Sequence, residues 1–166
     1  MDIVEAFEVS RETWQRLRDL RLRALQESPE SFASTFEKES AYSEADWIDL
    51  LSHESWLMLS INGRDVGIFA AKECDRSADW NKEVDCFIHS CWLDPLLRGK
   101  EVLPKMIKQL DSYCRSYGYH KLGLGVWPEN TRAIRAYEKL GWEQRGGLIP
   151  SKKVPGRLFV AMFKDI

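Results

Sequence analysis

The chain has 166 residues, of which 44% are hydrophobic and 30% are charged. This length and composition are typical of a domain with its own hydrophobic core, so we expect a single domain over residues 1–166. The formal net charge of −2 at pH 7 gives no overall positive field. We therefore expect neither a nucleic-acid nor a membrane partner.

Targeting and metal-binding signals are missing from the sequence. No run of 18 apolar residues occurs, and the first residues lack the basic and apolar regions of a signal peptide, so we expect a cytoplasmic protein. The four cysteines show no Cys-x-x-Cys spacing and the three histidines are scattered. These patterns favour free thiols over disulfides and predict no metal site.

The N-terminal third is predicted to form a strand and two helices. Alternation of apolar and polar residues predicts a strand over Ile3–Val9. Ser10 is a good cap for a following helix, which Ser28-Pro29 ends, and a second helix is expected from about Ser43. The apolar face of the first helix carries Trp14, Leu17, Leu20, the stem of Arg21, Ala24 and Leu25.

A hairpin is predicted next. The stretches Trp56–Ile61 and Asp65–Ala71 flank Asn62-Gly63, and an Asn-Gly pair accepts the positive φ angles of a two-residue turn. A polar loop over Glu73–Lys82 follows.

The second half of the chain alternates strands and helices. Val84–Leu93 is a long apolar run that ends at Asp94-Pro95, which makes it the best candidate for a central strand. Later elements are a helix over about Glu101–Tyr117, a strand over His120–Val126, a helix beginning at Asn130 and a last strand over Arg157–Phe163. This order predicts a mixed α/β fold.

The helix that begins at Asn130 is the most informative segment. Asn130 is a good N-cap and Gly141 a good stop, and one face of the helix carries Ala133, Ala136, Tyr137 and Leu140. By spacing alone Tyr137 is a core aromatic. Its position seven residues after Asn130 and directly before Glu138-Lys139-Leu140-Gly141-Trp142 also suits a functional tyrosine.

Together with the segment Cys91 to Lys100, in which a strand ends at Pro95 and leads into Arg98-Gly99-Lys100, this helix resembles the GNAT superfamily of N-acetyltransferases. Leu20-Arg21-Leu22, Ser28 to Phe32 and Val66-Gly67 are further matches. The resemblance implies a mixed central sheet of about six to seven strands, splayed in the middle and flanked by about four helices. It also implies transfer of acetyl from acetyl-CoA to a primary amine by direct attack, in a monomer or homodimer.

The resemblance further implies a cofactor site. Helix-start N–H groups would bind the CoA pyrophosphate, and Tyr137 would protonate the departing thiolate as general acid. The implied cofactor-binding residues are Cys91, Leu93, Arg98, Gly99, Lys100, Glu101, Val102, Leu103, Asn130, Ala133 and Tyr137.

Two positions depart from the family's pattern. Glu101 and Leu103 stand where the family places glycines that let phosphate approach the backbone. Because the liganding groups are backbone N–H groups, we expect altered rather than abolished cofactor binding. The alternative function is a catalytically weakened module of the same fold that senses CoA or a protein partner.

The general base and the acceptor pocket are less well defined. Asp85 lies thirteen residues before Arg98, the separation at which one branch of the family carries its catalytic carboxylate. Glu83 and His89 are rival bases, and histidine is the side chain that titrates nearest neutral pH. In the family the first helices and the last hairpin loop shape the acceptor pocket, which points to Phe32–Glu39 and Gly146–Gly156.

Overall fold

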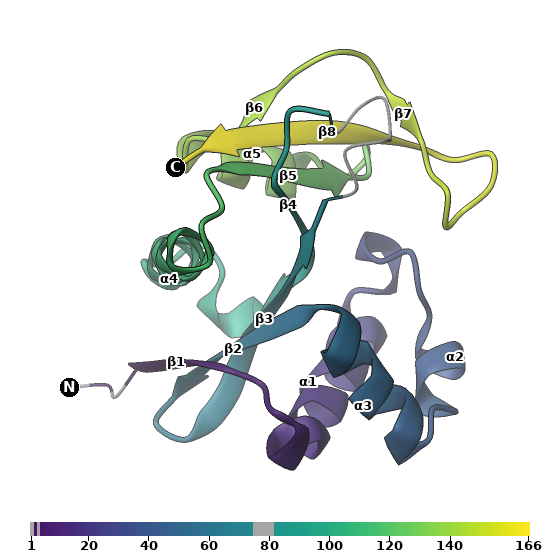
Figure 1. The fold of residues 1–166 in the computed structure, drawn as a ribbon, viewed down its shortest axis with the longest axis vertical. Helices are drawn as coiled ribbons and strands as arrows, with labels where there is room; N and C mark the ends of the chain where they lie inside the picture. Colours follow the sequence, from purple (N-terminus) through teal and green to yellow (C-terminus); the bar gives the residue numbers. More distant parts are fainter. Residues whose placement is uncertain (1, 3, 75–81) are drawn as a thin grey trace.

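The computed structural model describes residue 2 and residues 4–74 and 82–166, and the fold in Figure 1 is a twisted sheet with helices on both faces. The α-helices are α1 (Trp14–Glu27), α2 (Phe36–Ser40), α3 (Glu44–His53), α4 (Val102–Ser116) and α5 (Thr131–Lys139). The strands are β1 (Val4–Glu8), β2 (Ser55–Ile61), β3 (Arg64–Glu73), β4 (Cys86–Leu93), β5 (Lys121–Val126), β6 (Glu143–Gln144), β7 (Ile149–Pro150) and β8 (Leu158–Asp165). Short 3₁₀ turns η1 (Arg11–Thr13), η2 (Pro29–Ser31) and η4 (Pro95–Leu97) join some of these elements.

The sheet runs β1-β2-β3-β4-β5-β8-β6, and β7 also pairs with β8. All pairs are antiparallel except β4 with β5. The sequence predicted the mixed α/β fold and its splayed sheet correctly. The described residues form eight strands rather than six to seven, because β6 and β7 are two-residue strands too short to leave a periodic pattern. The short helix α2 was likewise not predicted.

The turn between β2 and β3 confirms the predicted hairpin. Asn62 has φ 52° and Gly63 has φ 77°, the left-handed values that a two-residue turn with an Asn-Gly pair adopts. Of the predicted polar loop, residues 75–81 lie outside the described residues.

Side chains of the strands alternate between two cores. On one face β2 contributes Leu57 and Leu59 to a cluster that includes Met106 of α4 and Tyr137 of α5. On the opposite face Trp56 and Met58 pack with apolar residues of α1 and α3, among them Leu17, Leu20 and Trp47. The period of two along each strand therefore places α4 and α5 on one side of the sheet and α1 and α3 on the other (Figure 1).

The central pair of parallel strands separates part-way along its length. β4 and β5 pair only from Cys86↔Leu122 to Ile88↔Leu124. Beyond Ile88, β4 has five more residues and none of them pairs with the described residues of β5.

Within the described ranges no helix is long and apolar enough to cross a membrane.

The link between α1 and α2 offers a test of the packing that holds the first helices. Arg21 and Glu39 form a buried ion pair in which Nε and Nη2 of Arg21 donate hydrogen bonds of 2.9 Å to the carboxylate. Glu39→Gln should lower the free energy of unfolding by roughly 3–5 kcal/mol, because it leaves the buried guanidinium without a counter-charge. Urea unfolding measures this change. Glu37 is exposed, so Glu37→Gln is the control and should change stability little. Equal effects of the two variants would contradict a stabilising role of the buried ion pair.

Candidate active site

A cleft of about 400 Å³ opens where β4 and β5 separate. Its walls come from the ends of these two strands, the loop before α4, the start of α5 and the η2 turn after α1. The lining includes Ser28, Glu30, Phe32, Ile88, His89, Ser90, Cys91, Leu93, Arg98, Gly99, Leu103, Trp127, Asn130, Arg132, Ala133 and Tyr137. The parting of two parallel strands, with helix N-termini beside it, gives a concave site at the carboxyl ends of the strands.

A β-bulge in β4 decides which side chains face this cleft. His89 pairs with Ala70 and Trp92 with Ile68, so three steps along β4 match two steps along β3. The extra residue breaks the alternation of side chains. As a result, Cys91 packs on the core that contains Tyr137, whereas His89 and Trp92 lie on the α1 side.

Tyr137 and Cys91 form the apolar side of the cleft. Tyr137 is 9% exposed and packs edge-on against Trp142, with ring centroids 6.1 Å apart. Burial, with the neighbouring Cys91 adding to it, raises the pKa of the Tyr137 phenol well above its ordinary value. Burial also raises the pKa of the Cys91 thiol. Both groups are therefore protonated at neutral pH, and the phenol is a proton donor held inside the cleft.

His89 lies on the polar side of the cleft, and Glu54, which is not in the lining, contacts its ring from behind. The register places Trp56, Ala70 and His89 in one row across β2, β3 and β4, and the Trp56 and His89 rings meet edge-on at 5.7 Å. Glu54, just before β2, pairs with Nε2 of His89 through a carboxylate oxygen. Burial alone would raise the pKa of the Glu54 carboxyl, but the His89 hydrogen bond and nearby positive charges outweigh it and lower the pKa. The pair is thus a histidine oriented by a carboxylate.

The loop before α4 lies at the outer end of the cleft, where Gly99 and Leu103 belong to the lining. Gly99 has φ 73°, a conformation that favours glycine, whereas Glu101 has φ −70° and ψ 8°, which any residue adopts. No side chain of the described residues caps the start of α4. The first N–H groups of an α-helix have no partner within the helix itself. The amide of Arg98 is already used, since it donates to the Pro95 carbonyl at 3.3 Å.

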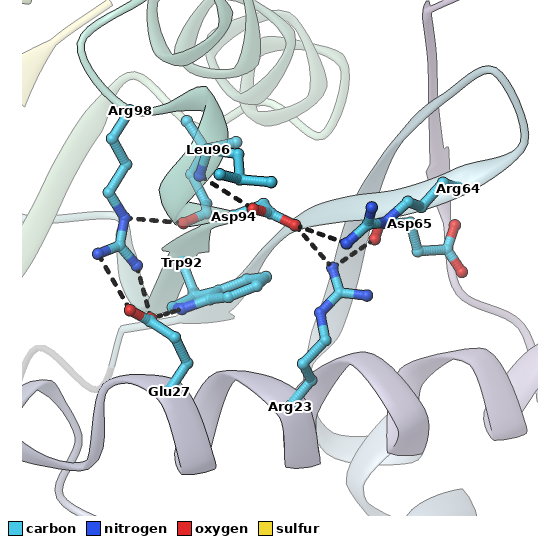
Figure 2. A network of polar contacts seen from close by, with 9 residues as sticks. Arg23, Glu27, Arg64, Asp65, Trp92, Asp94, Leu96 and Arg98 are labelled. Carbon is cyan, nitrogen blue, oxygen red and sulfur yellow. Dashed lines mark hydrogen bonds and ion pairs between the residues drawn. The ribbon is translucent and has the colours of Figure 1, made fainter.

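Arg98 fastens this loop to helix α1 (Figure 2). Its Nε donates to the Leu93 carbonyl at 2.9 Å, and its Nη2 donates to Glu27 at 2.8 Å. Glu27 also accepts hydrogen bonds from Trp92 Nε1 at 2.8 Å and from the Ser28 hydroxyl. The Arg98 side chain therefore holds the end of β4 against α1 and is not directed at a free anion.

A second carboxylate braces the same strand end. Asp94 accepts a hydrogen bond from the Leu96 amide at 3.0 Å, and its other oxygen pairs with Arg64 at 3.1 Å and Arg23 at 3.5 Å (Figure 2). Arg23 also donates to the Asp65 carbonyl at 2.7 Å. The turn that follows β4 is thus fixed on both sides before the amide-bearing loop begins.

The comparisons with known proteins agree with this geometry. The model of the Acetyltransferase (GNAT) family matches residues 14–142, which is most of the chain. The chain belongs to the GNAT acetyltransferase family. An uncharacterised N-acetyltransferase of Methanocaldococcus jannaschii is 28% identical over 99 residues, which are 60% of this chain and 43% of that protein. The chain therefore matches less than half the length of this relative.

Solved GNAT structures share the fold across the whole chain. An acetyltransferase of Streptococcus pneumoniae superposes with a TM-score of 0.75 at 14% identity, covering 99% of this chain and 100% of that one. An aminoglycoside acetyltransferase in complex with coenzyme A gives 0.72 at 19% identity, covering 98% and 95%. The spermidine N-acetyltransferase of Vibrio cholerae, in complex with CoA and spermine, gives 0.70 at 16% identity, covering 96% and 94%. At these identities the likeness concerns the fold.

Most of the residues that the GNAT resemblance suggested lie around the one cleft. Those that line it are Cys91, Leu93, Arg98, Gly99, Leu103, Asn130, Ala133 and Tyr137. Asn130 is the N-cap of α5, as predicted, and its Oδ1 accepts from the Ala133 amide at 3.2 Å. Lys100, Glu101 and Val102 lie in the adjoining loop and first turn of α4 but not in the lining.

Asp85 lies elsewhere. Its carboxylate accepts hydrogen bonds from the amides of His120 at 2.8 Å and Lys121 at 3.0 Å, at the start of β5. Neither Asp85 nor Glu83 lines the cleft, which opens at the opposite end of β4. The carboxylate aligns the beginnings of the two parallel strands, and His89 is the rival base that reaches the cleft.

Sequence reasoning also missed part of the site. Glu27, Glu54 and Ser90 carried no recognisable motif, because their contacts depend on strand register and on the bulge. In the sequence, Ser90 stands out only as a small polar residue inside an apolar strand. Of the two expected acceptor segments, Phe32 reaches the lining, whereas no residue from 146 to 156 does in the described part of the chain.

The Glu27 network predicts a pH-dependent stability. Burial alone would raise the pKa of the Glu27 carboxyl, but its three hydrogen-bond donors outweigh burial and lower the pKa. A carboxyl whose folded-state pKa is depressed stabilises the fold above the ordinary carboxyl pKa, and this stability is lost as the pH falls through the folded-state pKa. Glu27→Gln should therefore lower the free energy of unfolding by about 1–2 kcal/mol at pH 7, with the difference shrinking in acid.

Urea unfolding of the wild-type protein and of Glu27→Gln, from pH 7 down into acid, measures the difference in their free energies of unfolding. Glu143→Gln is the matched control, because Glu143 forms an exposed pair with Arg145 at 3.5 Å on β6. A Glu27→Gln penalty that is the same at all pH values would contradict the ion-pair explanation.

Proposed function

We propose that this protein is an N-acetyltransferase that binds acetyl-CoA in the cleft between β4 and β5 and transfers its acetyl group to a primary amine. The observation that carries the proposal is the buried, protonated Tyr137 beside Cys91, at the point where the two parallel strands part. Membership of the GNAT family supports acetyl-CoA as the cosubstrate. Structures with the same fold hold CoA, which adds to this support.

The cofactor would lie along the cleft with its pyrophosphate at the start of α4. Amides of the loop from Gly99 to Leu103 would offer donors there, and the positive end of the helix dipole favours an anion. Glu101 is exposed and outside the lining, so its carboxylate does not occupy the site. Leu103 does line it, and it narrows the space beside these amides. The backbone of β4 beyond Ile88, which does not pair with β5, is free to pair with the pantetheine arm.

In the proposed chemistry the proton donor, Tyr137, and the proton acceptor, His89, lie on opposite sides of β4. The amine nitrogen attacks the thioester carbonyl from the His89 side, a C–N bond forms, and the C–S bond breaks. Tyr137 donates its proton to the departing CoA thiolate, and His89, which lines the cleft, takes up the proton from the attacking amine. In this direct attack the acetyl group passes to the amine without a covalent enzyme intermediate.

The acceptor would enter from the side of α1 and η2. Glu30 and Phe32 line the cleft there, and Trp127, which follows β5, also belongs to the lining. The acidic side chain of Glu30 suits a cationic amine, whereas the Phe32 and Trp127 rings already have Arg21 and Arg157 over them. Spermine and ribostamycin are bound in solved structures of the same fold, which makes polyamines and aminoglycosides the first substrates to try.

A second function is favoured by one observation. Leu103, which replaces a family glycine, reaches into the lining and would suit a weakened enzyme that senses CoA. The two functions differ in turnover. A sensor binds CoA but releases none from acetyl-CoA, whatever amine is present.

We expect acetyl-CoA to raise the melting temperature, because a ligand that binds only the folded state stabilises it. We also expect amine-dependent release of CoA with at least one member of a panel of polyamines, aminoglycosides, amino acids and peptides. A thiol-reactive dye measures the release. Stabilisation by acetyl-CoA without release for any amine would favour the sensor, and no stabilisation would contradict the proposed site.

Tyr137→Phe should lower kcat by roughly 10²–10⁴-fold, the usual contribution of general acid catalysis. Only the hydroxyl is removed, and the ring and its packing against Trp142 remain, so the fold and the Kd for acetyl-CoA should change little. Calorimetric titration and steady-state rates separate the two effects. A variant with full activity would return Tyr137 to the role of a core aromatic.

A further inference from the structure

Ser90 has a backbone conformation that is uncommon for its residue type. Its φ is 57°, and Asn62 in the hairpin turn is the other non-glycine residue with positive φ in the described part of the chain. A left-handed serine inside a strand is disfavoured, and glycine would adopt this conformation without strain. Strained residues of this kind cluster at functional sites.

The strain places the Ser90 hydroxyl beside the His89 ring. In a regular strand neighbouring side chains point to opposite faces. In the bulge of β4, however, Ser90 Oγ lies 2.9 Å from His89 Nδ1. Both residues line the cleft.

The other nitrogen of His89 is held by Glu54. The His89 side chain is 18% exposed and the Glu54 side chain is 12% exposed, so the contact is shielded from solvent. The lowered pKa of Glu54 keeps it a carboxylate, which can only accept a hydrogen bond. In a neutral ring Nε2 therefore carries the proton, and Nδ1 is left as the acceptor for the Ser90 hydroxyl.

We propose that Ser90, His89 and Glu54 form a proton relay that receives the proton of the attacking amine. The relay rests on the proposed acetyl transfer and adds two residues to it. Ser90 is the catalytic group that touches the amine, and Glu54 is a positioning residue that acts through His89.

The proton balance is complete within the cleft. As the C–N bond forms, the amine proton passes to Ser90 Oγ while the Ser90 proton passes to His89 Nδ1. The resulting imidazolium is stabilised by the Glu54 carboxylate. Tyr137 gives one proton to the CoA thiolate and His89 gains one from the amine, so solvent exchange restores both groups for the next turnover.

Two substitutions of Ser90 separate the relay from a structural role. Ser90→Gly relieves the backbone strain and removes the hydroxyl, so the melting temperature should stay within about 3 °C of the wild-type value. Ser90→Ala removes the hydroxyl and keeps the strain. Both variants should lose roughly 10²-fold in kcat/KM for the amine, the lower end of the effect of a general base.

Ser52→Ala is a matched control. Ser52 Oγ lies 3.1 Å from Nδ1 of its neighbour His53, which reproduces the same pair on the exposed end of α3. This control should retain wild-type activity. Ser90→Ala or Ser90→Gly with activity within twofold of the wild type would overturn the relay.

The pH dependence tests Glu54. The titratable groups around it are His89, Lys72 of β3 and Lys153 of the loop after β7. Glu54→Gln removes the negative charge that favours the imidazolium, so the acidic limb of the kcat/KM profile should move to lower pH. A merely structural role would lower activity at all pH values without moving this limb, and that result would overturn the role of Glu54.

The relay and the proposed function fail in different ways. If the wild-type protein releases CoA with an amine and the Ser90 variants do so equally well, only the relay is wrong. If the wild-type protein releases CoA with no amine of the panel, the acetyl transfer is wrong and the relay falls with it.

Discussion

One extra residue in β4 sets the geometry of the whole site. Because the strand advances three residues where β3 advances two, Cys91 turns to the core that holds Tyr137 while His89 and Trp92 face α1. The end of β4 also no longer pairs with β5, and its backbone is left open to a ligand. A regular strand would put these side chains on other faces and close the gap between the strands.

The bulge needs support, and polar contacts on both sides of the end of β4 supply it. Glu27 ties Trp92 and Arg98 to α1, and Asp94 ties the following turn to β3 and α1 (Figure 2). These contacts fix the loop that opens into α4. The η2 turn continues directly from Ser28, so the η2 wall of the cleft and the loop before α4 are anchored to the end of the same helix.

The sequence predicted the elements well where the signal is local. Periodicity and capping located α1, α3, α4 and α5, and Asn62-Gly63 identified the hairpin. The short β6 and β7 escaped because two residues show no period. For the site, the sequence identified residues at the end of β4, in the loop before α4 and at the start of α5. It did not identify Glu54. Its contact with His89 is set by the register of three strands and by the bulge, which a single sequence does not reveal.

Asp85 shows the limit of spacing as a guide. Its separation from Arg98 suggested a base, but its carboxylate accepts the first amides of the β5 region at the far end of β4. Distance along the chain does not say at which end of a strand a side chain acts. His89, by contrast, had no advantage over its rivals in the sequence, and its place in the cleft wall is what distinguishes it.

The most direct test of the account is a crystal structure of the protein with CoA. We expect the pyrophosphate within hydrogen-bonding distance of amides between Gly99 and Leu103, and the sulfur between Cys91 and Tyr137. A cofactor bound outside the opening between β4 and β5, or with its sulfur away from Tyr137, would contradict the central claim.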